Sequence, residues 1–309
     1  MTLDPDIKKL LEVIEMNSPK DLNAISPNDF RSSFRQSALL FSGPKEEVEE
    51  VRDISFRYDN SEIPLRVYRP HNAGEGAIIY YHGGGFVIGD IEAYDSQCRK
   101  IANSSMQTVI SVGYRLAPEY KFPIWAYDSL EAYRWVFKNS SKLNINGSKI
   151  AVSGDSAGGN LSFVVPLMLL DRNLEVPKMI IALYPFIGVD TFSETWREYS
   201  HGLFLDREAM SYFAKMTRLN PEDFVDPYYS PAQHSNLSNL PESIIVTAEY
   251  DPLREQGETF LSQIREAGTR ATGIRALGMI HGFATFSGAS PAADKILRMI
   301  YRNAGRDLD

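Results

Sequence analysis

Apolar and polar positions along most of the chain follow the rhythm of strands that alternate with helices. From residue 76 onwards, short apolar runs, typical of strands buried on both faces, alternate with longer segments of helical periodicity. The expected strands cover residues 77–81, 108–112, 150–153, 179–183, 243–248 and 272–276. The expected helices cover residues 93–104, 125–138, 157–170, 253–267 and 291–303. This alternation predicts an α/β fold with a doubly wound, mostly parallel central sheet flanked by helices.

Two segments depart from this rhythm. Residues 1–45 carry apolar positions at helical spacing, and residues 188–228 hold an aromatic-rich helical pattern without an expected strand. We expect the two segments to form a helical cap over an α/β domain that comprises residues 46–187 and 229–309. An ordinary surface excursion is the alternative interpretation of residues 188–228. Between cap and sheet, two alternating runs in residues 51–69 predict a β-hairpin or a pair of edge strands.

Composition and charge exclude several classes of protein. Of the 309 residues, 43% are hydrophobic and 23% are charged, which excludes a disordered, collagen-like or coiled-coil chain. The net charge of −8 argues against nucleic-acid binding and against docking on an anionic membrane, because both need a basic face. The single cysteine, Cys98, permits no intramolecular disulfide and fits a reducing compartment. Since no signal-peptide pattern is present and the most apolar stretch, residues 161–170, is too short to span a membrane, we expect a cytoplasmic protein.

The strongest chemical motif is Gly154-x-Ser156-x-Gly158, which lies between an expected strand and an expected helix. A sharp strand-to-helix turn holds the serine in a strained conformation with its hydroxyl exposed, and the flanking glycines avoid clashes in that turn. The following helix points its N-terminus at the serine, where backbone N–H groups favour a developing negative charge. Ser156 is therefore the expected nucleophile, with a plain glycine-rich turn as the alternative.

A second motif, His82-Gly83-Gly84-Gly85, follows another expected strand. Consecutive glycines let backbone N–H groups approach a ligand oxygen, as the oxyanion holes of hydrolases require. We expect the N–H groups of Gly83, Gly84 and Ala157 to form such a hole, and His82 to hold the loop in place. A phosphate-binding loop is the competing interpretation, but the glycine spacing does not fit one.

A serine nucleophile also needs a base, which in this kind of fold follows it in the sequence. Three histidines come after Ser156. His201 lies in the expected cap and His234 lies in a polar loop. His281 follows the last expected strand, at the end of the sheet where the serine is expected, and we predict it to be the base.

The residue that orients the histidine is expected after the preceding strand. That position points to Asp251, and nearby Glu249 is the alternative because it lies within or at the edge of the strand. Asp251, His281 and Ser156 each follow a different expected strand, so a parallel sheet would bring them to one edge. Together they would supply a nucleophile, a base and an orienting carboxylate.

Five segments resemble the hormone-sensitive-lipase family of α/β-hydrolases, specifically its bacterial and archaeal carboxylesterases. They are HGGGFVIGD (82–90), YRLAPE (114–119), GDSAGGN (154–160), EYDPLRE (249–255) and GMIHGF (278–283). The resemblance, which covers about residues 50–303, implies an α/β-hydrolase fold with the cap and the catalytic domain divided as above. It also implies the triad of Ser156, Asp251 and His281, the oxyanion hole already named, and hydrolysis of short- to medium-chain esters without a cofactor. Gly113, where the family usually has Asp, Asn or Ser, and Pro166, inside the helix after the nucleophile, depart from what is expected.

Other functions and the substrate pocket stay open at this stage. Hydrolysis of amides or of a special metabolite ester would use the same residues, and a ligand-binding protein without catalysis is a further alternative. A metal hydrolase is disfavoured because no HExxH motif occurs. The expected partner is a small-molecule ester, and family analogy suggests a homodimer. The candidate pocket residues are Phe86, Val87, Tyr184 and Phe204, with Pro185 and Phe186 beside them.

Overall fold

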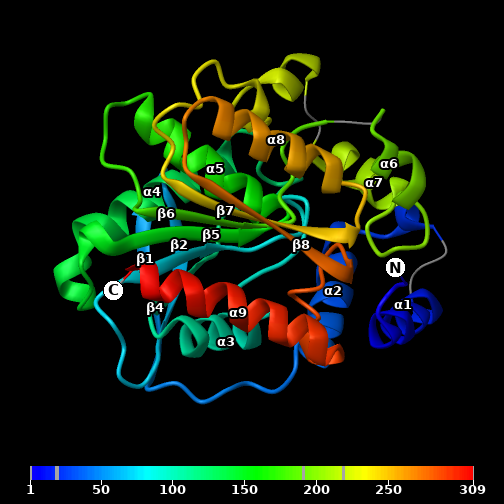
Figure 1. Cartoon of the computed structure of the whole chain (residues 1–309), viewed down its shortest axis with the longest axis horizontal. Coiled ribbons are helices and arrows are strands. Elements are labelled where there is room, and N and C mark those ends of the chain that lie inside the picture. The colour runs from blue at the N-terminus through cyan, green and yellow to red at the C-terminus, as the bar shows by residue number, and fades with distance from the viewer. Residues whose placement is uncertain (1, 18–20, 190–191, 218–219, 309) are drawn as a thin grey trace.

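The computed structural model describes residues 2–17, 21–189, 192–217 and 220–308. Within these residues, an eight-stranded sheet crosses the molecule in the order β1-β2-β4-β3-β5-β6-β7-β8 (Figure 1). Strand β2 pairs antiparallel with both β1 and β4, and every pair from β4 to β8 is parallel. The strands are β1 (Glu50–Tyr58), β2 (Ser61–Arg69), β3 (Ala77–Tyr81), β4 (Thr108–Val112), β5 (Ile150–Asp155), β6 (Met179–Leu183), β7 (Glu242–Tyr250) and β8 (Ala271–Ile280). The expected mostly parallel sheet is confirmed.

The strands in the middle of the sheet are the ones that the hydrophobic pattern predicts best. Every residue of β3, β4, β5 and β6 is buried, so their apolar runs are continuous, and three of the four have the expected bounds. Strands β7 and β8 extend several residues beyond their expected ends. In β8 the added residues include Gly278, whose φ of 75° interrupts the regular strand backbone, and a glycine at this place in the sequence resembles the end of a strand.

Helices cover both faces of the sheet (Figure 1). Helices α3 (Asp95–Ser105) and α9 (Pro291–Leu308) pack together on one face. Helices α4 (Ile124–Lys138), α5 (Ala157–Leu170) and α8 (Arg254–Glu266) lie on the other. Every residue of α5 from Ala157 to Leu169 is buried, Pro166 included, which explains why this helix is apolar on all sides.

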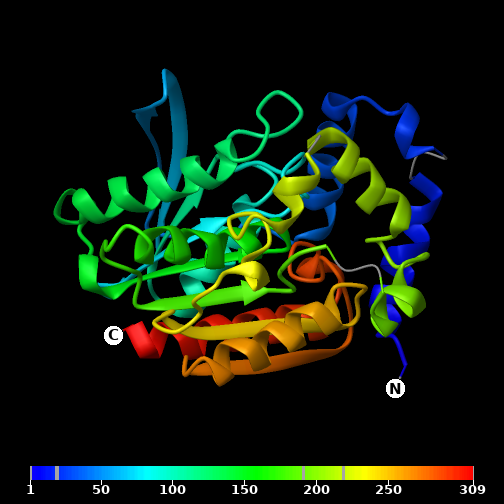
Figure 2. The same cartoon turned by 90° about the horizontal axis from the view of Figure 1, so that it is seen from above.

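Helices from the two expected cap segments gather beyond the ends toward which the parallel strands point (Figure 2). They are α1 (Pro5–Asn17), α2 (Pro27–Phe41), α6 (Glu194–Tyr199) and α7 (Arg207–Thr217). The N-terminal segment touches α7 through two hydrogen bonds: Leu22 N–H donates to Glu208 at 2.9 Å and the Tyr212 hydroxyl donates to the Ile25 carbonyl at 3.3 Å. The described residues of 188–228 form no strand, as expected, whereas residues 1, 18–20, 190–191 and 218–219 of the cap segments lie outside the described residues.

Helix α2 is tied to the α/β domain by two arginines. Arg31 donates to the carbonyl oxygens of Val87, at 2.8 Å, and Ala117, at 2.7 Å, and forms a two-pronged ion pair with Glu119. Arg35 pairs with Asp90, 2.9 Å from its Nε. Since Val87 and Asp90 follow the glycine motif, α2 is fixed directly to that part of the chain.

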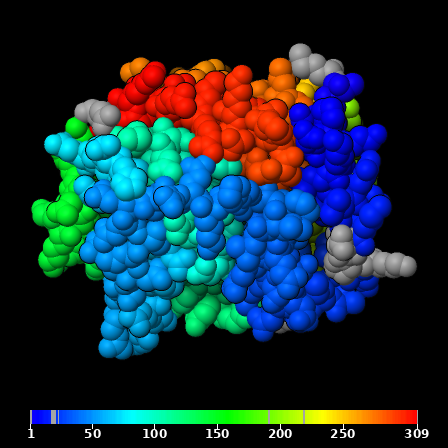
Figure 3. Space-filling model, turned by 90° about the horizontal axis from the view of Figure 1, so that it is seen from below, coloured from blue at the N-terminus to red at the C-terminus, as the bar shows by residue number. Residues whose placement is uncertain are grey.

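The start of the chain also packs against the C-terminal third of the molecule, and Figure 3 shows the blue N-terminal segment beside the orange and red segment. Asp4 N–H donates to the Gly278 carbonyl at 3.0 Å, and the Ser290 hydroxyl donates to the Asp4 carboxylate at 3.2 Å. These bonds hold the beginning of α1 next to β8 and α9. Among the described helices, none combines the length and the apolar character that a membrane crossing needs.

Candidate active site

Ser156 lies on the tight turn that joins β5 to α5. Its backbone has φ 54° and ψ −116°, a strained region for a residue with a side chain. A Cβ atom added to Gly158 would overlap the carbonyl oxygen of Tyr81, and one added to Gly154 would overlap Gly158. The turn therefore needs both glycines, as the motif predicts, and it presents the Ser156 hydroxyl at the N-terminus of α5.

The structure brings the three residues predicted as a triad together in one hydrogen-bonded chain. Nε2 of His281 lies 2.9 Å from Oγ of Ser156, and Nδ1 of His281 lies 2.8 Å from Oδ2 of Asp251. Asp251 is fully buried, and its other oxygen accepts the Leu253 N–H at 2.8 Å. This fixes the carboxylate so that it faces Nδ1, and an imidazole protonated there turns a free lone pair on Nε2 toward Ser156.

The alternative residues lie elsewhere. The Glu249 carboxylate accepts the Gly278 N–H at 2.7 Å, a bond between neighbouring strands that turns it away from His281. The His234 ring bonds Asp171 at 3.1 Å and the Asn236 carbonyl on the surface, and His201 is exposed. Geometry therefore favours Asp251 over Glu249.

The hydrogen bonds of the glycine loop, residues 82–85, correct one prediction. Gly83 N–H already donates to Oδ1 of Asp155 at 2.9 Å and to the Tyr94 hydroxyl at 3.1 Å, so it is not available to an oxyanion. Within the described residues, the N–H groups of Gly84 and Gly85 have no acceptor, nor has that of Ala157. Gly84 and Gly85 line the smaller cavity with Ser156, and Gly85 and Ala157 line the larger one with it, so these three N–H groups are the ones available to an oxyanion. The sequence shows Gly85 as the third glycine of the run, but it does not show which of the three glycines have a free N–H group.

Asp155 was not predicted, although it directly precedes the nucleophile. Its carboxylate is buried and accepts hydrogen bonds from the hydroxyls of Tyr80, at 2.8 Å, and Tyr94, at 3.0 Å, besides the bond from Gly83. Burial raises the pKa of this carboxyl to about 6, and the hydrogen bonds oppose that rise. A charged residue at the end of a wholly buried strand is the sequence signal that points to such a role.

His82 supports the loop as expected. Its ring is buried and stacked on Tyr114 with 4.3 Å between ring centres, and Nδ1 lies 2.8 Å from the Gly83 carbonyl. Burial lowers the pKa of this imidazole to about 4, so it is neutral at pH 7. The Tyr114 hydroxyl also donates to the His82 carbonyl at 2.6 Å, which fixes the start of the loop.

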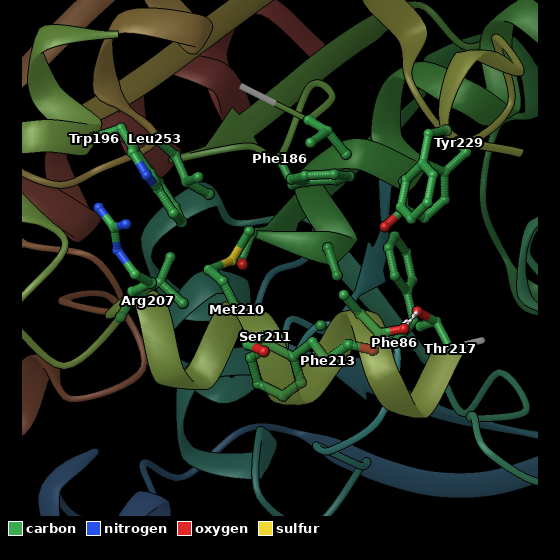
Figure 4. A pocket seen from close by; sticks show the side chains of 17 residues that line it. Phe86, Phe186, Trp196, Arg207, Met210, Ser211, Phe213, Thr217, Tyr229 and Leu253 are labelled. Atoms are coloured by element: carbon green, nitrogen blue, oxygen red, sulfur yellow. Dashed lines mark hydrogen bonds between the residues drawn. The ribbon is translucent and has the colours of Figure 1, made fainter. Parts of the chain in front are cut away.

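Two cavities open beside Ser156. The larger, of about 310 Å³, is lined by residues of α6, α7 and the start of α5, among others, and is mostly aromatic and aliphatic (Figure 4). The smaller, of about 80 Å³, lies next to His281. Phe86 and Phe186 line the larger cavity and Phe204 lines the smaller.

Three of the candidate pocket residues, Val87, Tyr184 and Pro185, line neither cavity. Val87 is fully buried, and Tyr184 packs behind His281 with 4.8 Å between ring centres. Their place in the sequence, directly after a loop or a strand, does not reveal which way the side chain turns. Among the residues that the structure describes, no group of three or more His, Cys, Asp or Glu side chains is arranged to hold a metal ion.

Comparison with known proteins agrees with the fold and the motifs. Residues 78–285 match a family described as alpha/beta hydrolase fold, and the chain belongs to that family. It is 37% identical to an arylesterase of Saccharolobus solfataricus, with 92% of each chain covered, and 30% identical to an ethyl acetate hydrolase of Pseudomonas putida, with 97% of this chain and 98% of the other covered. A solved esterase from Pyrobaculum calidifontis has a TM-score of 0.93 at 35% identity, with 99% of both chains covered. These relatives confirm the resemblance to esterases that the motifs indicate.

Proposed function

We propose that this protein is a serine carboxylesterase that hydrolyses short- to medium-chain carboxylic esters through an acyl-enzyme. The observation that carries the proposal is the chain of hydrogen bonds from Asp251 through His281 to Ser156, next to three backbone N–H groups that lack an acceptor among the described residues. The relatives named as ester hydrolases support the same activity.

In the first half of the reaction, Oγ of Ser156 attacks the carbonyl carbon of the ester while Nε2 of His281 takes the hydroxyl proton. Asp251 holds the imidazole in the required tautomer and stabilises the imidazolium that forms. Because the strained turn holds Ser156 at the mouth of both cavities, the hydroxyl needs little rearrangement before attack.

As the carbonyl carbon becomes tetrahedral, its oxygen gains negative charge. The N–H groups of Gly84, Gly85 and Ala157 would donate hydrogen bonds to that oxygen and stabilise its charge, and one such donor is worth about 10²- to 10³-fold in kcat. Gly83 supports them indirectly, because its bond to Asp155 ties the loop to the residue before the nucleophile.

Collapse of the tetrahedral intermediate breaks the bond to the alcohol oxygen, which takes the proton from Nε2 of His281 and leaves as the free alcohol. A water molecule then attacks the acyl group on Ser156, with His281 as base again. The carboxylic acid is released, and the serine recovers its proton.

The proposal is tested with purified protein and a panel of soluble esters and amides. A serine-directed organophosphate should inactivate the protein with one mole bound per mole, at Ser156 by peptide mass, and prior treatment with a chelator should leave activity unchanged. Ester hydrolysis without amide hydrolysis separates an esterase from an amidase. Binding without turnover, or covalent labelling at another residue, would contradict the proposal. The cytoplasmic location and the homodimer stay predictions.

A further inference from the structure

The two cavities beside Ser156 share part of their walls. Ser156, Gly85, Leu205 and Phe213 line both of them. The larger cavity extends beneath α6 and α7, where its other walls include Met210, Phe224 and Tyr229. Figure 4 shows Phe213 on α7 at the wall of this cavity.

Phe213 lies directly on the backbone beside the nucleophile. A Cβ atom added to Gly85 would overlap Cγ of Phe213, so the ring packs against the Cα of Gly85 without a gap. On the cap side, the ring stacks on Phe30 with 6.1 Å between ring centres and 6° between ring planes. Because Phe30 belongs to the anchored helix α2, Phe213 is held firmly between the cap and the glycine loop.

The chemistry of the site decides which cavity holds which half of the ester. The leaving alcohol oxygen must receive its proton from His281, so the alcohol group lies on the side of that histidine. His281 and Gly282 line the smaller cavity and are absent from the walls of the larger. The acyl group consequently extends along Ala157 into the larger cavity.

Building on the proposed esterase function, we propose that Phe213 separates an acyl cavity from an alcohol cavity and sets the size limit on the alcohol. The preferred substrates are then esters that join an extended apolar acyl group to a short alcohol. The volumes of about 310 and 80 Å³ are consistent with this asymmetry. Each methylene that fits a cavity is worth up to about fourfold in kcat/KM, whereas one that does not fit contributes nothing or clashes.

Two isomeric esters test which cavity holds the acyl group and which holds the alcohol, because the two molecules contain the same atoms. Ethyl hexanoate and hexyl acetate have the same formula, but the long chain is the acyl group in one and the alcohol in the other. We expect the wild-type protein to hydrolyse ethyl hexanoate with a kcat/KM roughly 10- to 200-fold higher, since four methylenes change cavity. Equal rates, or faster hydrolysis of hexyl acetate, would overturn the assignment of the cavities.

The role of Phe213 is tested with Phe213→Ala, and with Phe213→Leu should the smaller residue impair folding. Removal of the ring should raise kcat/KM for hexyl acetate. The ratio of kcat/KM for ethyl hexanoate to kcat/KM for hexyl acetate should then fall at least fivefold. Tyr199→Ala is the matched control, because Tyr199 is an aromatic residue of α6 that lines neither cavity, and it should leave the preference for ethyl hexanoate in place. An unchanged ratio in both Phe213 variants, with thermal unfolding showing folded protein, would overturn the partition.

Failure of this inference is distinguishable from failure of the esterase proposal. If the isomers are hydrolysed but in the opposite order, Ser156 is still the nucleophile and only the assignment of the cavities is wrong. If neither isomer is hydrolysed and the organophosphate labels no serine, the esterase proposal itself is wrong and the inference falls with it.

Discussion

The backbone N–H of Gly83 donates a 2.9 Å hydrogen bond to Oδ1 of Asp155, and this contact joins the glycine loop to the residue before the nucleophile. The two residues come close because β3 and β5 are neighbours, with Tyr81 opposite Gly154 in their register. The first glycine of the run therefore anchors the loop, whereas the N–H groups of the next two have no acceptor among the described residues. The hydrogen bonds from Gly83, Tyr80 and Tyr94 favour the charged form of this carboxylate, but burial disfavours the charge more strongly and its pKa is raised.

This balance predicts how Asp155 affects stability as the pH changes. Its folded pKa is raised by burial from 3.8 to about 6, so between about pH 4 and 6 the folded protein holds a proton that the unfolded chain has lost. Stability must then fall as the pH rises through this range, by at most about 1.4 kcal/mol per pH unit, and level off above it. The variant Asp155→Asn has no titrating group at this position. When its unfolding free energy is subtracted from that of the wild type, the difference should fall between about pH 4 and 6.

Urea unfolding of both proteins between pH 4 and 8 supplies the measurement. Subtracting the variant cancels the other titrating groups, including His82, whose lowered pKa acts in the opposite direction. A difference that stays flat from pH 4 to 8, or that grows with pH, would mean that the pKa of Asp155 is not raised in the folded protein.

The sequence alone could predict the residues whose position depends on strand ends. Ser156, Asp251 and His281 each follow a different parallel strand, and parallel strands end at one edge of a sheet. To predict that these three residues meet, it is therefore enough to know which runs form strands and that those strands run parallel. The buried strands β3 to β6 were predictable for the same reason, because burial on both faces leaves an uninterrupted apolar run.

The details that the sequence did not reveal depend on side-chain direction and local hydrogen bonding. The glycine run does not itself reveal which N–H groups are already bonded, and Gly83 differs from Gly84 only through its contact with Asp155. Likewise, Val87 and Tyr184 follow elements that border the site, but their side chains turn into the core. Those directions are set by tertiary contacts rather than by spacing along the chain.

A second prediction separates Asp251 from Glu249. Asp251→Asn should lower kcat by about 10⁴-fold with little change in KM, because an amide favours the wrong tautomer of His281. Glu249→Gln should be mild, since the amide oxygen of glutamine can still accept the Gly278 N–H. Steady-state kinetics on one soluble ester checks both variants. If Glu249→Gln proves the more damaging, the orienting carboxylate has been misassigned.

A third prediction concerns the nucleophile and its base. Ser156→Ala should abolish ester hydrolysis and leave the fold intact, and His281→Ala should lose activity to a comparable degree. The double variant should be no worse than either single variant, because the two groups act as one unit and their losses do not add. Circular dichroism controls for folding, and more than a few per cent of wild-type kcat in Ser156→Ala would rule out its role as nucleophile.

The last prediction is a chain-length profile that peaks at medium length. Helix α7, which walls the larger cavity, is hydrogen-bonded to the N-terminal segment that Arg31 and Arg35 anchor to the glycine loop. The cavity therefore has a finite length, and methylenes beyond that length stay in water and add no binding. Up to that limit each buried methylene contributes about 0.8 kcal/mol, roughly fourfold in kcat/KM. Ethyl esters keep the alcohol constant, and their kcat/KM should rise from acetate, peak between butanoate and octanoate, and fall toward hexadecanoate.

An interfacial lipase would instead show its highest rate on the longest chains, or a jump in rate once the substrate passes its solubility limit, because its lid opens a broad apolar surface onto lipid. Either result here would mean that the cap moves as such a lid and does not bound the cavity.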